Sequence, residues 1–265
     1  MRKKLGLALG AGGSRGVAHI GFLQALEEFD IRPDFLTGCS MGAIVGACYA
    51  AGASPEELKK AVIGLNLSDL AALNFAPFRS NGLMRMTKAR KLIFDLIGEK
   101  TFDELKIPFA CVATDLEKGE TVVLEKGNVI DCALASSSIP GVFTPAQVNG
   151  YHMLVDGGIL ERVPTKELKK MGAEIIVAMD VLGDLSEAKE PSGTLINTLL
   201  RVIDVMDTHS TMNKRRARKR YVDLYLEPDL GGMDQYQVKN LNFAYEKGYE
   251  LGVAERENIK KLIED

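Results

Sequence analysis

The stretch Gly38-Cys39-Ser40-Met41-Gly42 places a serine between two glycines, and the rest of the chain is interpreted outward from it. Residues Asp34–Leu36 before it are typical of the end of a buried strand, and the apolar run 43–51 after it is typical of a helix. This is the G-x-S-x-G pattern of a nucleophile elbow, in which a sharp turn lifts the serine hydroxyl clear of a sheet. Gly38 and Gly42 allow the turn and let the helix approach the strand closely. Ser40 is therefore a candidate nucleophile.

The composition is that of an ordinary globular protein. Of 265 residues, 46% are hydrophobic and 26% are charged, which suits one large α/β domain. The formal net charge of −3 gives no sign of nucleic-acid binding. Four cysteines, Cys39, Cys48, Cys111 and Cys132, show neither C-x-x-C spacing nor histidine partners. We expect them to be buried free thiols in a reducing compartment, and Cys39 to be a small core residue because Ser40 holds the motif position.

Targeting signals are absent from the sequence pattern. The apolar run Leu5–Leu9 is short and leads into glycines rather than a cleavage site. No apolar run approaches the ~18 residues that span a bilayer. We therefore expect a cytoplasmic protein.

Strand and helix patterns alternate along the chain. Strands are predicted at residues 5–9, 34–36, 109–114, 121–124, 151–155, 174–180 and 222–226, and helices at 17–29, 43–51, 88–97, 164–171, 195–206 and 241–263. A further helix is predicted to begin at the capping box Ser54-Pro55-Glu56-Glu57, and a loop is predicted over 184–193. This alternation predicts an α/β fold of three layers, α/β/α, with a mostly parallel central sheet. Without repeats or linkers, we expect a single domain over residues 1–265.

Residues 66–97 show a looser pattern, in which apolar side chains are mixed with Pro77 and Gly82. Such a segment either covers a site as a lid or packs on the domain. Packing is the more common role of apolar side chains.

The stretch Gly10-Ala11-Gly12-Gly13-Ser14-Arg15-Gly16 is the second chemical element. A dinucleotide fingerprint would need glycine where Arg15 stands and an acidic residue where Gly38 stands, and a P-loop would need a closing Gly-Lys-Ser/Thr. The third interpretation is an oxyanion hole formed by the backbone N–H groups of Gly12 and Gly13. Glycine would be needed there because a Cβ would obstruct the substrate.

A serine nucleophile needs a base, and the chain has three histidines. We expect His19 to be structural and His152 to lie partly exposed on a strand. His209 has the chain order of an α/β-hydrolase triad but falls near the end of a predicted helix. Asp156 in Val155-Asp156-Gly157-Gly158 is the better candidate, because it ends an apolar strand before a glycine turn.

Together these pieces resemble the patatin-like phospholipases. The resemblance rests on Gly10–Gly16, Gly38–Gly42 and Asp156-Gly157 in order and spacing, and on Ala135–Pro145, which looks like the family's segment between nucleophile and aspartate. It covers nearly the whole chain. The family's first loop usually carries an unbroken glycine run, which Ala11 interrupts here while leaving Gly12 and Gly13 in place.

The resemblance implies a serine acyl hydrolase that releases fatty acids from phospholipids or related lipid esters. Ser40 would form an acyl-enzyme, Asp156 would act as base in a Ser–Asp dyad, and Gly12 and Gly13 would stabilise the oxyanion. Arg15 would either fix the loop or attract an anionic head group. We expect no cofactor and no metal, because no His, Asp or Glu cluster has ligand spacing.

Two rival classes stay open. A general carboxylesterase or thioesterase would use a Ser-His-Asp triad with His209, and a nucleotide-binding module would need residues other than Arg15 and Gly38. The run Lys214–Arg220 has six basic residues in seven. It is either a solvated helix face or a site of transient contact with an anionic membrane, at ~1 kcal/mol per basic residue. The sequence leaves the oligomeric state open.

Overall fold

A computed structural model describes residues 2–63, 86–182, 195–218, 221–236 and 240–264. Its strands form one mixed sheet in the order β5-β6-β3-β2-β1-β7-β8, with β4 also paired to β3. The strands are β1 (Leu5–Leu9), β2 (Phe35–Cys39), β3 (Phe109–Asp115), β4 (Glu120–Leu124), β5 (Ala146–Val148), β6 (Tyr151–Asp156), β7 (Ile175–Met179) and β8 (Leu224–Leu226). The central run from β3 to β8 is parallel, while β4, β5 and β6 pair antiparallel. The predicted mostly parallel sheet is confirmed.

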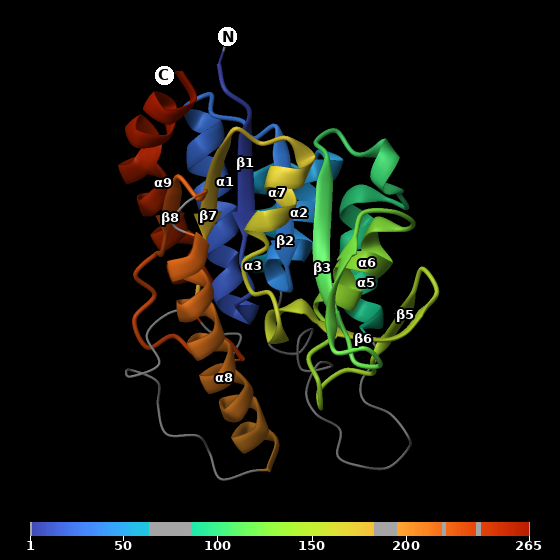
Figure 1. Cartoon of the computed structure of the whole chain (residues 1–265). Coiled ribbons are helices and arrows are strands. Elements are labelled where there is room, and N and C mark those ends of the chain that lie inside the picture. Colours follow the sequence, from blue (N-terminus) through green and yellow to red (C-terminus); the bar gives the residue numbers. More distant parts are fainter. Residues whose placement is uncertain (1, 64–85, 183–194, 219–220, 237–239, 265) are drawn as a thin grey trace.

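Helices cover both faces of this sheet (Figure 1). They are α1 (Ala18–Glu28), α2 (Met41–Ala51), α3 (Pro55–Ile63), α5 (Thr87–Ile97), α6 (Val129–Ser136), α7 (Thr165–Met171), α8 (Leu195–Arg218) and α9 (Leu241–Glu264), with short 3-10 turns η1 (Gly13–Val17), η2 (Phe102–Glu104) and η3 (Gly157–Ile159). Helix α7 packs on β1, β2 and β7 over a small apolar cluster, and α1, α2 and α9 belong to a much larger one. The predicted three-layer arrangement is confirmed, with most of the core on one side.

Two strands end against the same edge of β3, and this positions the site. Strand β2 runs parallel to the first half of β3, with Cys39 paired to Val112. Strand β6 runs antiparallel to the second half, with Asp156 paired to Ala113. Since β4 occupies the other edge of β3 along 111–115, β2 and β6 must share one edge and meet end to end there. The residues that follow Cys39 and those around Asp156 are therefore brought together by strand register.

Helices α1 and α9, far apart in the sequence, pack backbone against backbone (Figure 1). A Cβ added at Gly21 would lie 2.0 Å from the Tyr245 carbonyl oxygen, and one at Gly248 would lie 1.8 Å from that of Ala18. Only glycine leaves room for contacts this close. The Lys3 N–H also donates to the Ile263 carbonyl at 2.7 Å.

Helix α8 is longer than predicted and turns its polar face inward. The sequence spacing predicts an apolar stripe that faces the core, formed by Leu195, Leu199, Val202, Ile203 and Met206. Ile203 lines the pocket described below, but Val202 and Met206 are 49% and 66% exposed, while Asp204 and Asp207 are buried. An amphipathic helix normally buries the opposite face. Asp207 pairs with a buried arginine and Asp204 accepts from two residues before α9, as described below, and these polar contacts hold the aspartates inside.

The capping box at Ser54 is confirmed, since the Glu57 carboxylate accepts from both the Ser54 N–H and its hydroxyl. Helix α6 and strand β5 were not predicted. The loop at 184–193 and residues 66–85 of the lid segment lie outside the described residues, and the end of that segment is α5, which buries Ile93 and Ile97. The single domain stays a prediction.

Candidate active site

Ser40 lies at the turn between β2 and α2, in a backbone conformation with φ +54° and ψ −123°. A residue with a side chain rarely adopts a positive φ, and such strain costs of order 1–3 kcal/mol. The glycines around it are required by contact: a Cβ at Gly38 would lie 2.5 Å from the Gly42 oxygen, and one at Gly42 would lie 2.2 Å from the Leu9 oxygen. The elbow therefore holds α2 directly against β1 and β2.

The Ser40 hydroxyl donates to Asp156 Oδ2 at 2.6 Å. Asp156 is buried at the end of β6, and its other oxygen, Oδ1, accepts from the Gly158 N–H at 2.8 Å. A Cβ at Gly157 would lie 2.3 Å from the Val112 oxygen, so a glycine is needed directly after the aspartate. Burial raises the pKa of Asp156 to about 6, although its hydrogen bonds to Ser40 and Gly158 lower it. A carboxylate with that pKa is a far better base near neutral pH than an ordinary aspartate.

The glycine loop between β1 and α1 borders the same site. Gly13 has φ +51°, and a Cβ on it would lie 2.2 Å from the Gln235 carbonyl oxygen, while a Cβ on Gly12 would lie 2.3 Å from the Val181 side chain. Glycine is thus required here by packing behind the loop, a reason different from the predicted approach of substrate. Among the described residues, neither the Gly12 N–H nor the Gly13 N–H donates to an acceptor. Both N–H groups belong to residues that line the pocket.

The remaining residues of the loop hold it in place. Arg15 is buried and donates through Nε to the Met233 carbonyl at 2.6 Å and through Nη1 to the Leu182 carbonyl. Of the two predicted roles of Arg15, the structure favours fixing the loop. Gly10 offers its carbonyl to His19 Nε2 at 2.8 Å, and a Cβ at Gly16 would lie 2.4 Å from Met41 Cγ.

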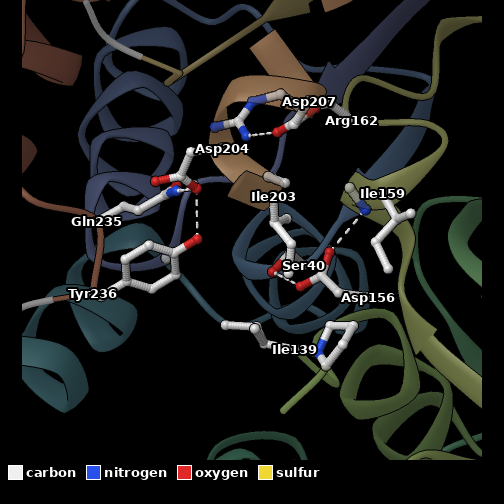
Figure 2. A pocket seen from close by; sticks show the side chains of 15 residues that line it. Ser40, Ile139, Asp156, Ile159, Arg162, Ile203, Asp204, Asp207, Gln235 and Tyr236 are labelled. Carbon is white, nitrogen blue, oxygen red and sulfur yellow. Dashed lines mark hydrogen bonds and ion pairs between the residues drawn. The ribbon is translucent and has the colours of Figure 1, made fainter. Parts of the chain in front are cut away.

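Ser40, Asp156, Gly12 and Gly13 all border one pocket (Figure 2). It is lined by Ala11, Gly12, Gly13, Ser40, Ile139, Pro140, Asp156, Gly158, Ile159, Arg162, Ile203, Asp204, Asp207, Gln235 and Tyr236. Figure 2 shows Asp204, Gln235 and Tyr236 on one side and Ser40 with Asp156 on the other. The pocket therefore has two parts beside the serine. The aliphatic part contains Ile139, Ile159 and Ile203, and the polar part contains Arg162, Asp204, Asp207, Gln235 and Tyr236.

The polar part was missed by sequence reasoning. Arg162 is buried between two carboxylates: its Nε contacts Asp180 at 3.2 Å and its Nη1 contacts Asp207. Burial alone would lower the pKa of Arg162, but Asp207 and Asp180 outweigh it and the pKa is raised. Burial raises the pKa of Asp207 despite the arginine. Asp207 lies three residues after Asp204 on α8, and this spacing was the available signal.

Asp204 is fixed by two residues from the segment before α9. Tyr236 donates its hydroxyl, and Gln235 its Nε2, to Asp204 Oδ1, each at 2.6 Å. Burial raises the pKa of Asp204. Nothing in the local sequence around Gln235 or Tyr236 marks them, since their roles depend on contact with α8.

The other candidates lie elsewhere. His209 is exposed on α8 and does not line the pocket, His152 is exposed on β6, and His19 is fully buried. Burial lowers the pKa of His19 to about 4. All four cysteines are buried and free, as predicted. Burial raises the pKa of the Cys39 thiol well above its usual range, which disfavours it as a nucleophile.

The described residues hold neither a metal-binding cluster nor a helix that could cross a membrane. They contain no group of three or more His, Cys, Asp or Glu side chains that could hold a metal ion. Among the helices that the structure describes, none has the length and apolarity to cross a bilayer.

Comparison with known proteins agrees with this architecture. The sequence model of the Patatin-like phospholipase family matches residues 7–169, which include the glycine loop, Ser40 and Asp156. The chain belongs to the patatin-like phospholipase family. This confirms the family to which the sequence motifs pointed.

Individual relatives cover different parts of the chain. An uncharacterized NTE family protein of Mycobacterium tuberculosis is 36% identical over 180 residues, 68% of this chain and 49% of that protein. A protein named lysophospholipase nte1 from Emericella nidulans is 27% identical over 98% of this chain but 18% of its own length. The crystal structure of VipD from Legionella pneumophila matches with a TM-score of 0.59 at 14% identity, covering 97% of this chain and 67% of VipD. The chain thus spans about half the length of the mycobacterial relative and less than a fifth of the fungal one. At 14% identity, the likeness to VipD shows the fold alone.

Proposed function

We propose that this protein is a serine acyl hydrolase that releases fatty acids from phospholipids or related lipid esters. The observation that carries the proposal is the 2.6 Å hydrogen bond from the Ser40 hydroxyl to a buried carboxylate, Asp156, at a nucleophile elbow. Membership of the patatin-like phospholipase family and a relative named lysophospholipase support a lipid ester as substrate. Aliphatic side chains of the pocket offer a surface for the acyl chain.

In this mechanism Asp156 takes the Ser40 proton as the serine oxygen attacks the ester carbonyl. The N–H groups of Gly12 and Gly13 stabilise the oxyanion of the tetrahedral intermediate. The alcohol leaves with a proton from Asp156, and an acyl-enzyme on Ser40 remains. Water, activated by the same carboxylate, then releases the fatty acid and regenerates the serine.

The test is labelling with a fluorophosphonate probe, located by peptide mass spectrometry. We expect label on Ser40 in the wild type, label slowed by about 10²–10⁴-fold in Asp156→Asn, and wild-type labelling in His209→Ala. Label that survives without Asp156 but requires His209 would instead identify a triad esterase. A folded wild type that takes no label would contradict the proposed activity.

Membrane contact is a separate part of the proposal. The basic run 214–220 lies outside the described part of the chain, apart from the backbone of α8 up to residue 218. Its sequence supports transient attraction to anionic lipid. Co-sedimentation with vesicles should rise with their anionic lipid content, and binding that ignores this content would argue against the attraction.

A further inference from the structure

The last turn of α6 contacts both members of the proposed dyad. The Ser40 N–H donates to the Ser136 hydroxyl oxygen at 2.9 Å, and that hydroxyl donates to the Val112 carbonyl at 2.6 Å. Two residues later, the Ser138 carbonyl accepts from the Asp156 N–H at 2.9 Å. One short segment therefore touches the backbone of the nucleophile and the backbone of the carboxylate.

The Ser136 hydroxyl occupies the place where the sheet is interrupted. Val112 is the register partner of Cys39, the last residue of β2, so the chain leaves the β2–β3 ladder at Ser40. At Ser40, where φ is positive, the backbone N–H donates to a side chain instead of to the neighbouring strand. The Ser136 hydroxyl, with one donor and two lone pairs, accepts from the displaced N–H and donates to the Val112 carbonyl.

The same carbonyl lies close to the aspartate side of the site. Gly157, which follows Asp156, passes so near to the Val112 oxygen that a Cβ would lie 2.3 Å from it. Ser136 is fully buried, so water cannot replace its hydroxyl without rearrangement. A strained backbone persists only when its surroundings fix it from several sides.

From these contacts we infer that Ser136 is a positioning residue of the site: its hydroxyl fixes the strained backbone of Ser40 so that the serine Oγ meets Asp156. This inference rests on the proposed function. Ser136 acts through the backbone of Ser40 and does not itself touch the reacting atoms. Its removal should therefore slow the chemical step and leave binding of the probe or substrate nearly unchanged.

The neighbouring Ser137 supplies a matched control. It too is buried, but its hydroxyl donates to the Ala133 carbonyl of its own helix at 2.9 Å. Ser137→Ala removes a buried serine hydroxyl from the same turn without touching Ser40. Ser136→Cys is the second variant, since it keeps a side chain of similar size with a weak donor and acceptor.

The experiment measures the rate of fluorophosphonate labelling at Ser40 against probe concentration, after circular dichroism has confirmed folding. We expect the limiting rate to fall about 10–100-fold in Ser136→Ala and less in Ser136→Cys, with the half-saturating concentration unchanged. Ser137→Ala should label like the wild type. The pH midpoint of labelling should stay near that of the wild type in Ser136→Ala, because the surroundings of the Asp156 carboxylate are intact.

Two results would overturn the inference. One is wild-type labelling in Ser136→Ala, and the other is an equal loss in Ser137→Ala, which would indicate general packing of α6. If the wild type itself takes no label, the proposed function fails. If the wild type is labelled at Ser40 and Ser136→Ala is labelled equally fast, only this inference fails.

Discussion

The glycine-rich edge of the sheet, made of the turns at 10–16, 38–42 and 157–158, borders the same pocket as helix α8. Different kinds of contact hold these two regions in place. At the glycine edge, backbone touches backbone: Gly42 lies against the Leu9 carbonyl and Gly157 against that of Val112. At α8, charged side chains make the contact, with Asp207 paired to Arg162 in the interior. Contacts of the first kind leave a signature in local sequence, and contacts of the second kind appear only when distant segments are folded together.

This difference explains what could be predicted. Strand and helix periodicity gave the three-layer fold, and the glycine motifs led to Ser40, Asp156, Gly12 and Gly13, which the structure brings into one pocket. The orientation of α8 could not be deduced from its own pattern, because Val202 and Met206 predict a core-facing stripe that the structure exposes.

Other misses have the same cause. Helix α6 is short, and Ser136 at its end contacts a residue 96 positions away, so no periodic signal marks either. Gln235 and Tyr236 are likewise defined by Asp204 on another element. The packing that requires glycine at Gly12 and Gly13 could not be predicted either, since their neighbours Val181 and Gln235 are distant in sequence.

The largest expected effect comes from removing the cation that holds α8. Arg162→Met leaves Asp180 and Asp207 buried without their counter-ion, and we expect a loss of about 3–5 kcal/mol in the free energy of unfolding by urea. Arg90→Met is the control, because Arg90 pairs with Glu99 at the surface and should cost below about 1 kcal/mol.

Adding Asp180→Asn and Asp207→Asn to Arg162→Met should restore part of that stability, since no buried charge is then left unpaired. Equal losses in Arg162→Met and Arg90→Met would show that the buried arginine contributes no more to stability than a surface ion pair does.

The glycine edge has its own buried titratable group, His19, whose Nε2 donates to the Gly10 carbonyl at 2.8 Å and whose Nδ1 lies 3.2 Å from Met179 Sδ. Its folded-state pKa of about 4 lies below that of an unfolded histidine, 6.5. Its contribution to stability is therefore complete above pH 6.5 and is lost as pH falls toward 4, by about 3 kcal/mol.

Unfolding by urea at several pH values should show the wild type losing about 3 kcal/mol relative to His19→Gln between pH 6.5 and 4. Protonation of Asp156, whose pKa is raised, stabilises both proteins over this range and cancels in the comparison. The exposed His152 gives the control variant, His152→Gln, which should keep the wild-type slope. A wild-type slope in His19→Gln would mean that the acid loss comes from other groups.

The activity of the glycine edge should depend on pH through Asp156. The base must be ionised, and its pKa is about 6, so the labelling rate should rise through that pH and level off above it. At pH 4 about 1% of the carboxyl is ionised, which predicts a fall of about 100-fold from the plateau. A midpoint well below pH 5 would show that Asp156 is more hydrated than its burial indicates.

The smallest expected effect lies on the outer face of α8. Met206→Ser replaces a side chain that is 66% exposed, and we expect the unfolding free energy to change by less than about 0.5 kcal/mol. Thermal or urea unfolding measures this directly. A loss above about 2 kcal/mol would show that the apolar stripe is packed in solution, and the reversed orientation of α8 would then be wrong.

The backbone contact between α1 and α9 has a consequence for how the protein is made. Residues of α9 are synthesised more than 200 residues after those of α1. Gly21 allows the backbone of α9 to approach closely, and Gly248 allows the same for the backbone of α1. Neither glycine has a side chain that could pack against another segment. The contact between α1 and α9 can therefore form only after the intervening sequence and α9 itself have been synthesised.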